Sequence, residues 1–287
     1  MKNIRIIPRL DIKGPNLVKG IHLEGLRVLG KPETFARYYY EQGADELLYV
    51  DVVASLYNRN SILPVIERTA KEIFIPLTVA GGLRTIDDIK AALRAGADKV
   101  ALNTAALKNP GLIQEAAERF GSSTIVVAIE AIRSPDGRYF AYTDNGREST
   151  GVDVLGWASR VAELGAGEIL LTSVDRDGTR KGFDIELTRL VSDAVSIPVI
   201  ACGGAGEADH VRQAVSEGHA DAVSAASIFH YDCIEHNPLE GEYDAEGNIE
   251  FMKHRKEQHG HRASIGLREL KKYLYEHGVP CRYESGT

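Results

Sequence analysis

The sequence predicts a single closed (β/α)8 barrel, an α/β fold assembled from two similar halves. The first reason is an internal repeat: residues 75–82 read Ile-Pro-Leu-Thr-Val-Ala-Gly-Gly, and residues 197–204 read Ile-Pro-Val-Ile-Ala-Cys-Gly-Gly. The repeat length is about 120 residues, which is too long for a solenoid. The second reason is chain length, because 287 residues accommodate a barrel of about 250 residues with insertions.

Eight short apolar runs alternate with eight helical patterns. The predicted strands cover residues 4–10, 47–52, 76–80, 98–102, 124–130, 168–173, 198–202 and 221–225. The predicted helices cover residues 33–42, 60–73, 85–95, 110–119, 153–164, 186–194, 207–217 and 265–277. Strands that are apolar throughout, each followed by a helix, are typical of a parallel sheet buried on both faces. Eight such units in two halves favour a barrel over an open doubly wound sheet.

Two segments interrupt this alternation. Residues 12–31 are predicted to form a long loop after the first strand, and residues 231–263 a charged insertion between the eighth strand and the last helix. Both follow the carboxyl end of a strand, so both are expected on the face that carries the active site of such barrels. We therefore expect one domain, 1–287, with the 231–263 loop over its C-terminal face.

Composition excludes several classes of protein. A net charge of −7 argues against a nucleic-acid-binding surface. Three widely spaced cysteines are typical of a reducing compartment, and the charged N-terminal run resembles neither a signal peptide nor a membrane span. The sequence thus predicts a cytoplasmic protein without membrane association, and no pattern in it calls for a cofactor.

Two carboxylates end strands that lie opposite each other in the predicted barrel. Asp11 ends the first strand and Glu130 ends the fifth. One interpretation is that each of these acids simply caps a loop. The occurrence of such an acid in both halves favours a catalytic pair. Two carboxylates in different surroundings can divide the acid and base steps of one reaction.

The glycine pairs of the repeat predict two anion sites. Backbone N–H groups of a Gly-Gly turn can approach a phosphate closely, and a helix N-terminus attracts one. The segments after the fourth and eighth strands, Asn103-Thr104 and Ala226-Ser227, are expected to open helices beside these glycine pairs. The matched pair of sites indicates a long ligand with a phosphate group at each end.

A charged ring is predicted at the opposite end of the barrel. Glu46, Lys99 and Glu168 enter the second, fourth and sixth strands at the same level, and Arg5 begins the first strand. An ion network that closes the bottom of the barrel is one interpretation. The other is a gate that admits a small polar molecule.

The chain resembles the cyclase (HisF) subunit of imidazole glycerol phosphate synthase, the ammonia-using part of a glutamine amidotransferase in histidine biosynthesis. The resemblance covers residues 4–230 and the last helix. It rests on several motifs: Ile-Ile-Pro-x-Leu-Asp (6–11), Val-Lys-Gly (18–20), Gly-Ala-Asp-Glu-Leu (43–47), Gly-Ala-Asp-Lys-Val (96–100), Asn-Thr-Ala-Ala (103–106), Glu-Ile-Leu-Leu-Thr-Ser-Val-Asp-Arg-Asp-Gly-Thr (168–179) and Ala-Ala-Ser-Ile-Phe-His (225–230).

The resemblance implies a lyase of the cyclase type, with Asp11 as a catalytic acid or base. It implies an ammonia gate at the charged ring and a class I, HisH-like glutaminase docked on that N-terminal face. It also implies a phosphorylated small-molecule substrate bound by two groups of residues. These are Gly82, Asn103 and Thr104 at one end, and Asp177, Gly178, Gly203, Gly204, Ala226 and Ser227 at the other, with Lys19 on a mobile loop above.

Three departures from the family pattern leave alternatives open. Glu130 stands where the family has an aspartate, Arg9 stands where it has a small residue, and the 231–263 insertion has no counterpart. One alternative is a non-cyclising paralogue that passes ammonia to a sugar amidotransferase of a surface-polysaccharide pathway. Another is a phosphoribosyl isomerase of the sister barrel family, although an isomerase needs no ammonia gate.

The histidines around the insertion follow no metal-binding spacing. A lid or a partner-binding loop is the favoured interpretation, and no metal site is predicted there. The residues concerned are His230, Cys233, His236, His254, His259 and His261.

Overall fold

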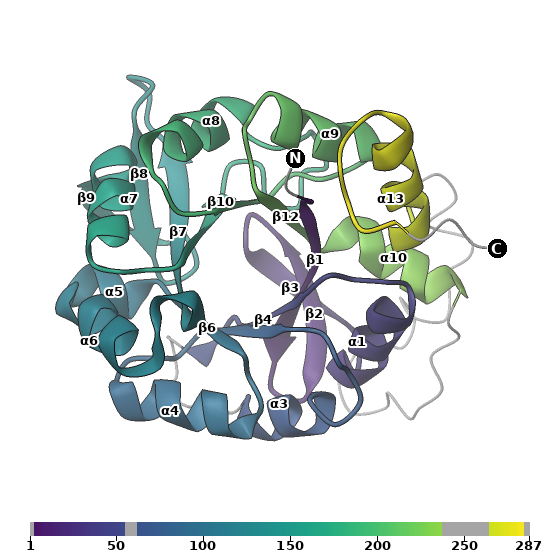
Figure 1. Ribbon diagram of the computed structural model, residues 1–287, viewed down its shortest axis with the longest axis horizontal. Coiled ribbons are helices and arrows are strands. Elements are labelled where there is room, and N and C mark those ends of the chain that lie inside the picture. Colours follow the sequence, from purple (N-terminus) through teal and green to yellow (C-terminus); the bar gives the residue numbers. More distant parts are fainter. Residues whose placement is uncertain (1–2, 55–61, 237–263, 284–287) are drawn as a thin grey trace.

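The computed structural model describes residues 3–54, 62–236 and 264–283. Eight parallel strands form a closed ring with helices around its outside (Figure 1). The strands are β1 (Arg5–Lys13), β4 (Leu47–Asp51), β5 (Leu77–Ala80), β6 (Lys99–Leu102), β7 (Ile125–Arg133), β10 (Glu168–Ser173), β11 (Val199–Cys202) and β12 (Ala222–Ala225). Around the ring the strands pair in the order β10, β11, β12, β1, β4, β5, β6 and β7. The ring closes because β7 also pairs with β10. The predicted (β/α)8 barrel is confirmed.

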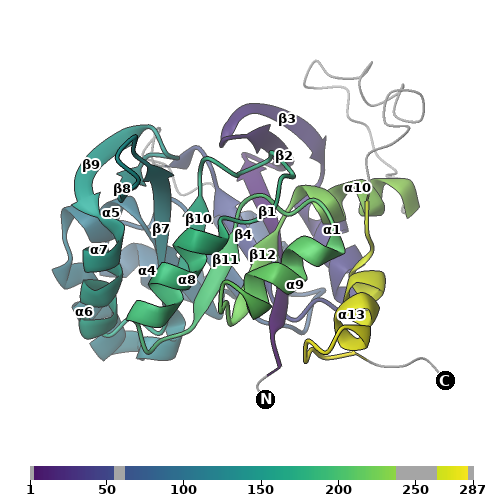
Figure 2. The same ribbon diagram turned by 90° about the horizontal axis from the view of Figure 1, so that it is seen from above.

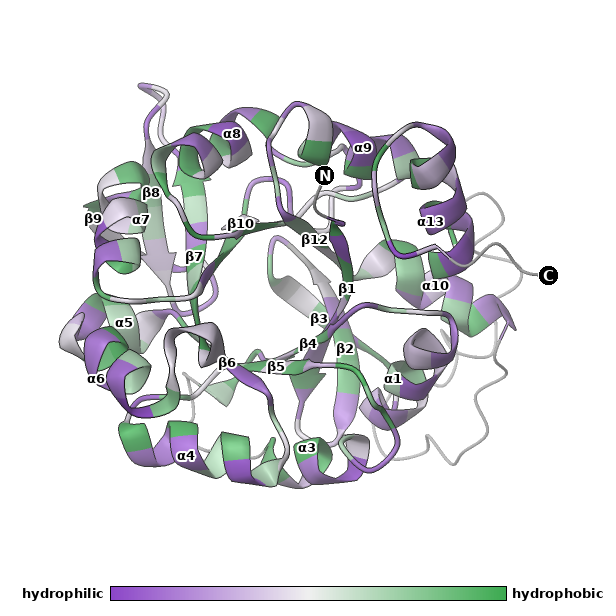
Figure 3. Cartoon of the chain, in the orientation of Figure 1, coloured by the Kyte–Doolittle hydropathy of each residue, from purple (hydrophilic) through white to green (hydrophobic). Residues whose placement is uncertain are grey.

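The surrounding helices lie where the apolar periodicity predicts them. They are α1 (Pro32–Glu41), α3 (Leu63–Thr69), α4 (Ile86–Ala95), α6 (Gly111–Phe120), α7 (Val154–Glu163), α8 (Ile185–Ala194), α9 (Ala208–Ser216) and α13 (Leu267–Glu276). Side-chain caps start several of them: Thr85 forms a capping box with Asp88 on α4, and Asp153 and Asp184 cap α7 and α8. Apolar and polar residues alternate around these helices (Figure 3). None of the helices among the described residues is long and apolar enough to span a membrane.

Side-chain alternation along the strands creates two cores. Ile6, Leu10 and Ile12 of β1 belong to the large core between the barrel and its helices, whereas Ile7 belongs to a small core inside the barrel. The small core also contains Leu48, Ala80, Ala101, Val126, Leu170, Ile200, Cys202 and Ala222. The inward positions of β1 therefore form a column of residues at 5, 7, 9 and 11, which runs from the bottom of the barrel to its mouth.

The segment 12–31 is a β-hairpin rather than the predicted loop. Strands β2 (Asn16–Ile21) and β3 (Glu24–Gly30) pair antiparallel, and β2 also pairs with the end of β1. A second hairpin, which the sequence analysis did not predict, consists of β8 (Tyr139–Thr143) and β9 (Glu148–Asp153) and extends β7. Both hairpins rise at the end of the barrel opposite the two termini (Figure 2).

The region after β12 begins differently from the prediction. Helix α10 runs from Ser227 to His236, so residues 231–236 continue a helix instead of opening a loop. The rest of the predicted insertion, 237–263, lies outside the described residues. A short helix α5 (Thr104–Lys108) and a 3-10 turn (Ser122–Thr124) are the remaining elements of the described residues.

Candidate active site

Arg9 and Asp11 form an ion pair at the mouth of the barrel. The guanidinium Nε of Arg9 donates to Oδ1 of Asp11 over 2.7 Å, and both residues are buried. Both sit in the inward column of β1, directly below the β2–β3 hairpin. Hydrogen bonds between charged groups are stronger than neutral ones, so this pair holds the Asp11 carboxylate in a defined orientation.

Glu130 occupies the corresponding position on β7, and its surroundings favour the neutral acid. Burial raises its pKa from 4.5 to about 7, although a hydrogen bond from the Gly146 N–H and the charge of Arg9 oppose that rise. The Gly146 N–H donates to Oε2 over 2.8 Å from the β8–β9 turn. A carboxyl group with a pKa near neutrality can exchange a proton under physiological conditions.

This pKa leads to a prediction about stability. In the unfolded chain Glu130 loses its proton near pH 4.5, but in the folded chain it does so near pH 7. The folded state holds more protons in between, so this group removes stability as the pH rises from about 5 to about 8. The unfolding free energy of Glu130→Gln, measured relative to that of the parent protein, should therefore rise by about 2 kcal/mol between pH 5 and pH 8. Urea unfolding at the two pH values measures it.

The exposed Glu118 on α6 supplies a matched control. Glu118→Gln should show no comparable pH-dependent gain in unfolding free energy. A constant difference between Glu130→Gln and the parent protein across the pH range would contradict the assignment of a raised pKa to Glu130.

One predicted phosphate end is a cavity beside Glu130. It has a volume of about 190 Å³ and is lined by Gly82, Asn103 and Thr104, as the sequence predicted. Arg84 and Lys108 add two cations at its rim, and Asn145 covers it from the β8–β9 turn. We call this the first half-site. Helix α5 is only five residues long, so the backbone N–H groups of its first turn would attract an anion more than a helix dipole would.

The other predicted end lies beside Asp11, and we call it the second half-site. Its cavity measures only about 30 Å³. All the residues that the sequence analysis assigned to this end line it: Lys19, Asp177, Gly178, Gly203, Gly204, Ala226 and Ser227. The tip of the β2–β3 hairpin lies over the adjoining loop, where the His22 N–H donates to the Asp177 carbonyl over 3.0 Å. The hairpin thus covers this half-site and brings Lys19 to it.

The repeated glycines have a shared geometric cause. Gly81 and Gly203 both adopt φ of +94°, and a Cβ at either position would meet a backbone carbonyl. The closest atoms would be the oxygen of Asp51, at 2.3 Å, and that of Ser173, at 2.6 Å. Only glycine permits this conformation together with such close packing. The repeat in the sequence is therefore a repeat of one turn, placed on opposite sides of the mouth.

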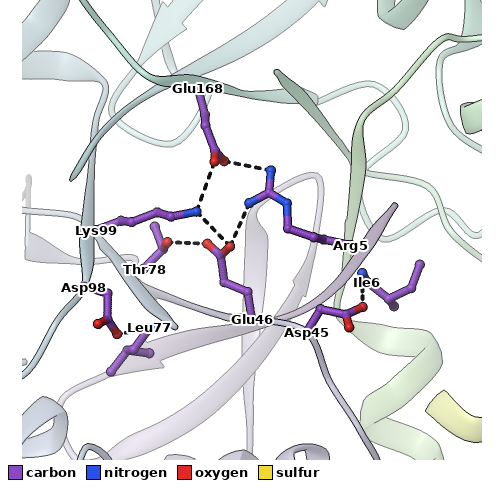
Figure 4. A network of polar contacts seen from close by, with 9 residues as sticks. All are labelled: Arg5, Ile6, Asp45, Glu46, Leu77, Thr78, Asp98, Lys99 and Glu168. Atoms are coloured by element: carbon purple, nitrogen blue, oxygen red, sulfur yellow. Dashed lines mark hydrogen bonds and ion pairs between the residues drawn. The ribbon is translucent and has the colours of Figure 1, made fainter. Parts of the chain in front are cut away.

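The charged ring forms at the bottom of the barrel as predicted (Figure 4). Arg5 donates to Glu46 over 2.8 Å and to Glu168 over 3.0 Å. Lys99 donates to the same two carboxylates over 2.9 and 3.1 Å, which closes a cycle of alternating charges. Glu46, at 2% exposed in its side chain, also accepts a hydrogen bond from Thr78. Every carboxylate in the ring is thus paired with two cations.

The aspartates of the Gly-Ala-Asp motifs do not join the ring. Asp45 accepts a hydrogen bond from the Ile6 N–H over 2.8 Å, and Asp98 accepts one from the Leu77 N–H over 2.9 Å. Each aspartate therefore anchors the start of a neighbouring strand. This leaves the following residue, Glu46 or Lys99, free to point into the barrel.

Of the residues considered for a metal, those that the structure describes are not gathered into a site. Nδ1 of His230 is hydrogen-bonded to the Tyr39 hydroxyl over 2.6 Å, and burial lowers the pKa of His230 to about 3. No group of three or more histidine, cysteine or acidic side chains suited to a metal occurs among the described residues. His254, His259 and His261 lie outside them.

Sequence reasoning missed the residues supplied by the β8–β9 hairpin. Asp144 and Asn145 have positive φ in its turn and line the first half-site. The signal was present, because Asp144-Asn145-Gly146 follows a strand-like Tyr-Phe-Ala-Tyr-Thr run, and such turn residues are typical of a β-hairpin. Arg84 and Lys108 carry no motif, and only the folded chain brings them to the rim.

A barrel with two half-sites in opposite sectors of its mouth, a carboxyl group lining each of them and a charged ring beneath defines a (β/α)8 barrel enzyme. The chain belongs to the histidine biosynthesis protein family, whose model matches residues 5–235. It is 61% identical over 207 residues to imidazole glycerol phosphate synthase subunit HisF of Legionella pneumophila, an alignment that covers 72% of this chain and 98% of that protein.

These similarities confirm the predicted relationship to the HisF subunit and, with it, the prediction of a cyclase-type enzyme subunit. They favour neither the sugar-amidotransferase conduit nor the sister-family isomerase over it. The catalytic, binding and gating roles of individual residues are developed as proposals below.

Proposed function

We propose that this chain is an ammonia-using cyclase subunit of the imidazole glycerol phosphate synthase type, which acts on a substrate with a phosphate group at each end. The observation that carries the proposal is that Asp11 lines one half-site and Glu130 the other, with Arg9 bordering both. A ligand anchored at both ends would have its middle beside both carboxyl groups. Such anchoring positions the reacting atoms and so supplies much of the rate enhancement.

The two carboxyl groups are suited to different steps. Attack of ammonia on a carbon atom requires a base to remove a proton from nitrogen and an acid to protonate the departing oxygen. Asp11, paired with a permanent cation, serves as the base. Glu130, with a pKa of about 7, serves as the acid. This division follows the general rule that paired carboxyl groups in different environments take different roles.

The interior of the barrel supports delivery of ammonia from below. Above the charged ring lies the small apolar core, which includes Ile7, Leu48, Val126 and Leu170. An uncharged ammonia molecule crosses such a lining far more readily than ammonium does. The ring of Arg5, Glu46, Lys99 and Glu168 would then act as the gate at the entrance.

The N-terminal face also offers a surface for a glutaminase. Phe74, in the loop before β5, is 81% exposed and lies edge-on to Tyr40. It borders a groove of about 860 Å³ between the end of α1 and helix α13, where Arg268, Lys272 and Tyr283 supply cationic and aromatic groups. Exposed aromatic residues of this kind are typical anchors of protein interfaces. We propose that the glutaminase docks across this face.

Replacing Phe74 tests the docking surface. Because an aromatic anchor can contribute about 2 kcal/mol or more to binding, Phe74→Asp should lower glutamine-dependent turnover at limiting glutaminase by about 30-fold. Turnover with ammonium salt should stay within about twofold, since the mouth is untouched. Leu190→Asp, at an exposed leucine of α8 away from this face, is the matched control. Equal loss with both ammonia sources would contradict the docking role.

The function as a whole is tested with purified protein and the bisphosphate substrate of the histidine pathway. We expect turnover with ammonium salt alone, and turnover with glutamine only when the glutaminase is added. Absence of turnover with ammonium salt, by protein that still binds the substrate, would contradict the proposed cyclase.

A further inference from the structure

Arg9 lies at the centre of the mouth. It occupies the inward column of β1, above Ile7 of the apolar core, and only 6% of its surface is exposed. It borders the second half-site with Asp11 and also the first half-site with Glu130. Among the described residues, Arg9 is the only one that lines both of these cavities.

The hydrogen bonds of Arg9 leave donors unused. A guanidinium group has five N–H donors. Nε donates to Asp11, and one N–H of Nη1 donates to the Cys202 sulfur over 3.5 Å. Within the described residues Nη2 makes no hydrogen bond. Buried charged donors are normally satisfied, so these N–H groups are available to an acceptor inside the mouth.

The surrounding charges hold Arg9 in place. Besides Asp11, its cation acts on Asp177 and Glu130, where it opposes the rise in pKa that burial causes at both carboxyl groups. The guanidinium is therefore fixed among acids that come from three different strands or their loops. A fixed planar fork of donors is well suited to an oxygen acceptor in a defined position.

We propose that Arg9 is a specificity-determining residue that donates hydrogen bonds to a carbonyl-type oxygen in the middle of the substrate. This proposal rests on the proposed function, because it assumes a ligand whose two phosphate ends occupy the two half-sites. The oxygen belongs to a carboxamide, ketone or carboxylate group. A ligand without such an oxygen leaves the donors of Arg9 unsatisfied and binds less tightly.

Two synthetic probes separate this contact from general attraction to anions. One is an unsubstituted polymethylene bisphosphate, and the other is a bisphosphate of the same length with a carboxamide on its middle carbon. The parent protein should bind the carboxamide probe more tightly by about tenfold or more, because a hydrogen bond to a charged donor is involved. Isothermal titration calorimetry measures both dissociation constants. The readout is their ratio, from which any general loss of charge attraction cancels.

In Arg9→Met the ratio should fall to within about twofold of unity, since the donor fork is gone. Arg9→Lys keeps the charge but not the fork, so its ratio should lie between those of Arg9→Met and the parent, and it answers the question if Arg9→Met does not fold. Arg160→Met, on the outer surface of α7, removes the same charge and should leave the ratio unchanged.

The outcomes separate the two proposals. A preference for the carboxamide probe that is as large in a folded Arg9 variant as in the parent protein overturns the role of Arg9 and leaves the proposed function standing. Equal binding of the two probes by the parent protein overturns it as well. If the parent protein binds neither probe nor the pathway substrate, the proposal of a ligand with two phosphate groups is wrong, and with it the proposed function.

Discussion

Asp11→Asn is expected to reduce ammonia-dependent turnover by about 100- to 10,000-fold, the usual contribution of a positioned acid or base. The amide has nearly the same shape as the carboxylate but cannot accept a proton from the attacking nitrogen. It also no longer offers Arg9 a charged partner over 2.7 Å. Initial rates at saturating ammonium salt and bisphosphate substrate measure the effect.

The control for this variant is Asp136→Asn. Asp136 lies in the exposed turn between β7 and β8, away from both half-sites, so its replacement should leave turnover unchanged. Substrate binding by Asp11→Asn, measured by calorimetry, should stay within about tenfold of the parent value, because the phosphate contacts remain. Turnover of Asp11→Asn within tenfold of the parent rate would exclude Asp11 as the base.

Glu130→Gln is expected to lower turnover by about 100-fold or more and to remove a pH dependence near neutrality. Glu130 changes from protonated to ionised around its pKa of about 7. As the acid of the reaction it must carry a proton, so turnover of the parent protein should fall as the pH rises through 7. Profiles of rate against pH, recorded at a constant concentration of uncharged ammonia, measure this limb.

Glu130→Asp is the informative comparison, since it keeps the carboxyl group but shortens its arm. It should retain a limb in the pH profile, although the position of the limb can shift with the new surroundings of the carboxyl. Its rate should fall as well, because a displacement of about 1 Å can lower a rate about 100-fold. A limb near pH 7 that persists in Glu130→Gln would assign the titration to another group.

Much of the fold follows from local patterns in the chain. Apolar runs such as Leu47–Asp51 are hydrophobic on both sides, and only a sheet covered on both faces accommodates them. The Gly-Gly turns are equally local, because positive φ at Gly81 and Gly203 is a property of the residue itself. Repetition of both signals in two halves was sufficient to predict the barrel and to place the candidate half-sites.

The hairpins were harder to predict because pairing between strands depends on partners elsewhere in the fold. Asn16–Ile21 contains glycine and lysine and reads as a loop, yet it forms a strand because the extended end of β1 presents unpaired backbone groups beside it. The β8–β9 hairpin likewise extends β7. Its turn then supplies Asn145 to the first half-site.

The sequence by itself determined the barrel, the two glycine turns, the facing carboxyl groups of Asp11 and Glu130 and the charged ring, although β1 and β7 continue past these two residues to Lys13 and Arg133. Each depends on residue type and spacing, which the chain carries directly. Only the tertiary structure decided that Arg9 lies between the two half-sites and that burial brings the pKa of Glu130 to about 7. Burial and electrostatic interaction depend on distances between residues far apart in the sequence, and those distances exist only after the barrel has closed.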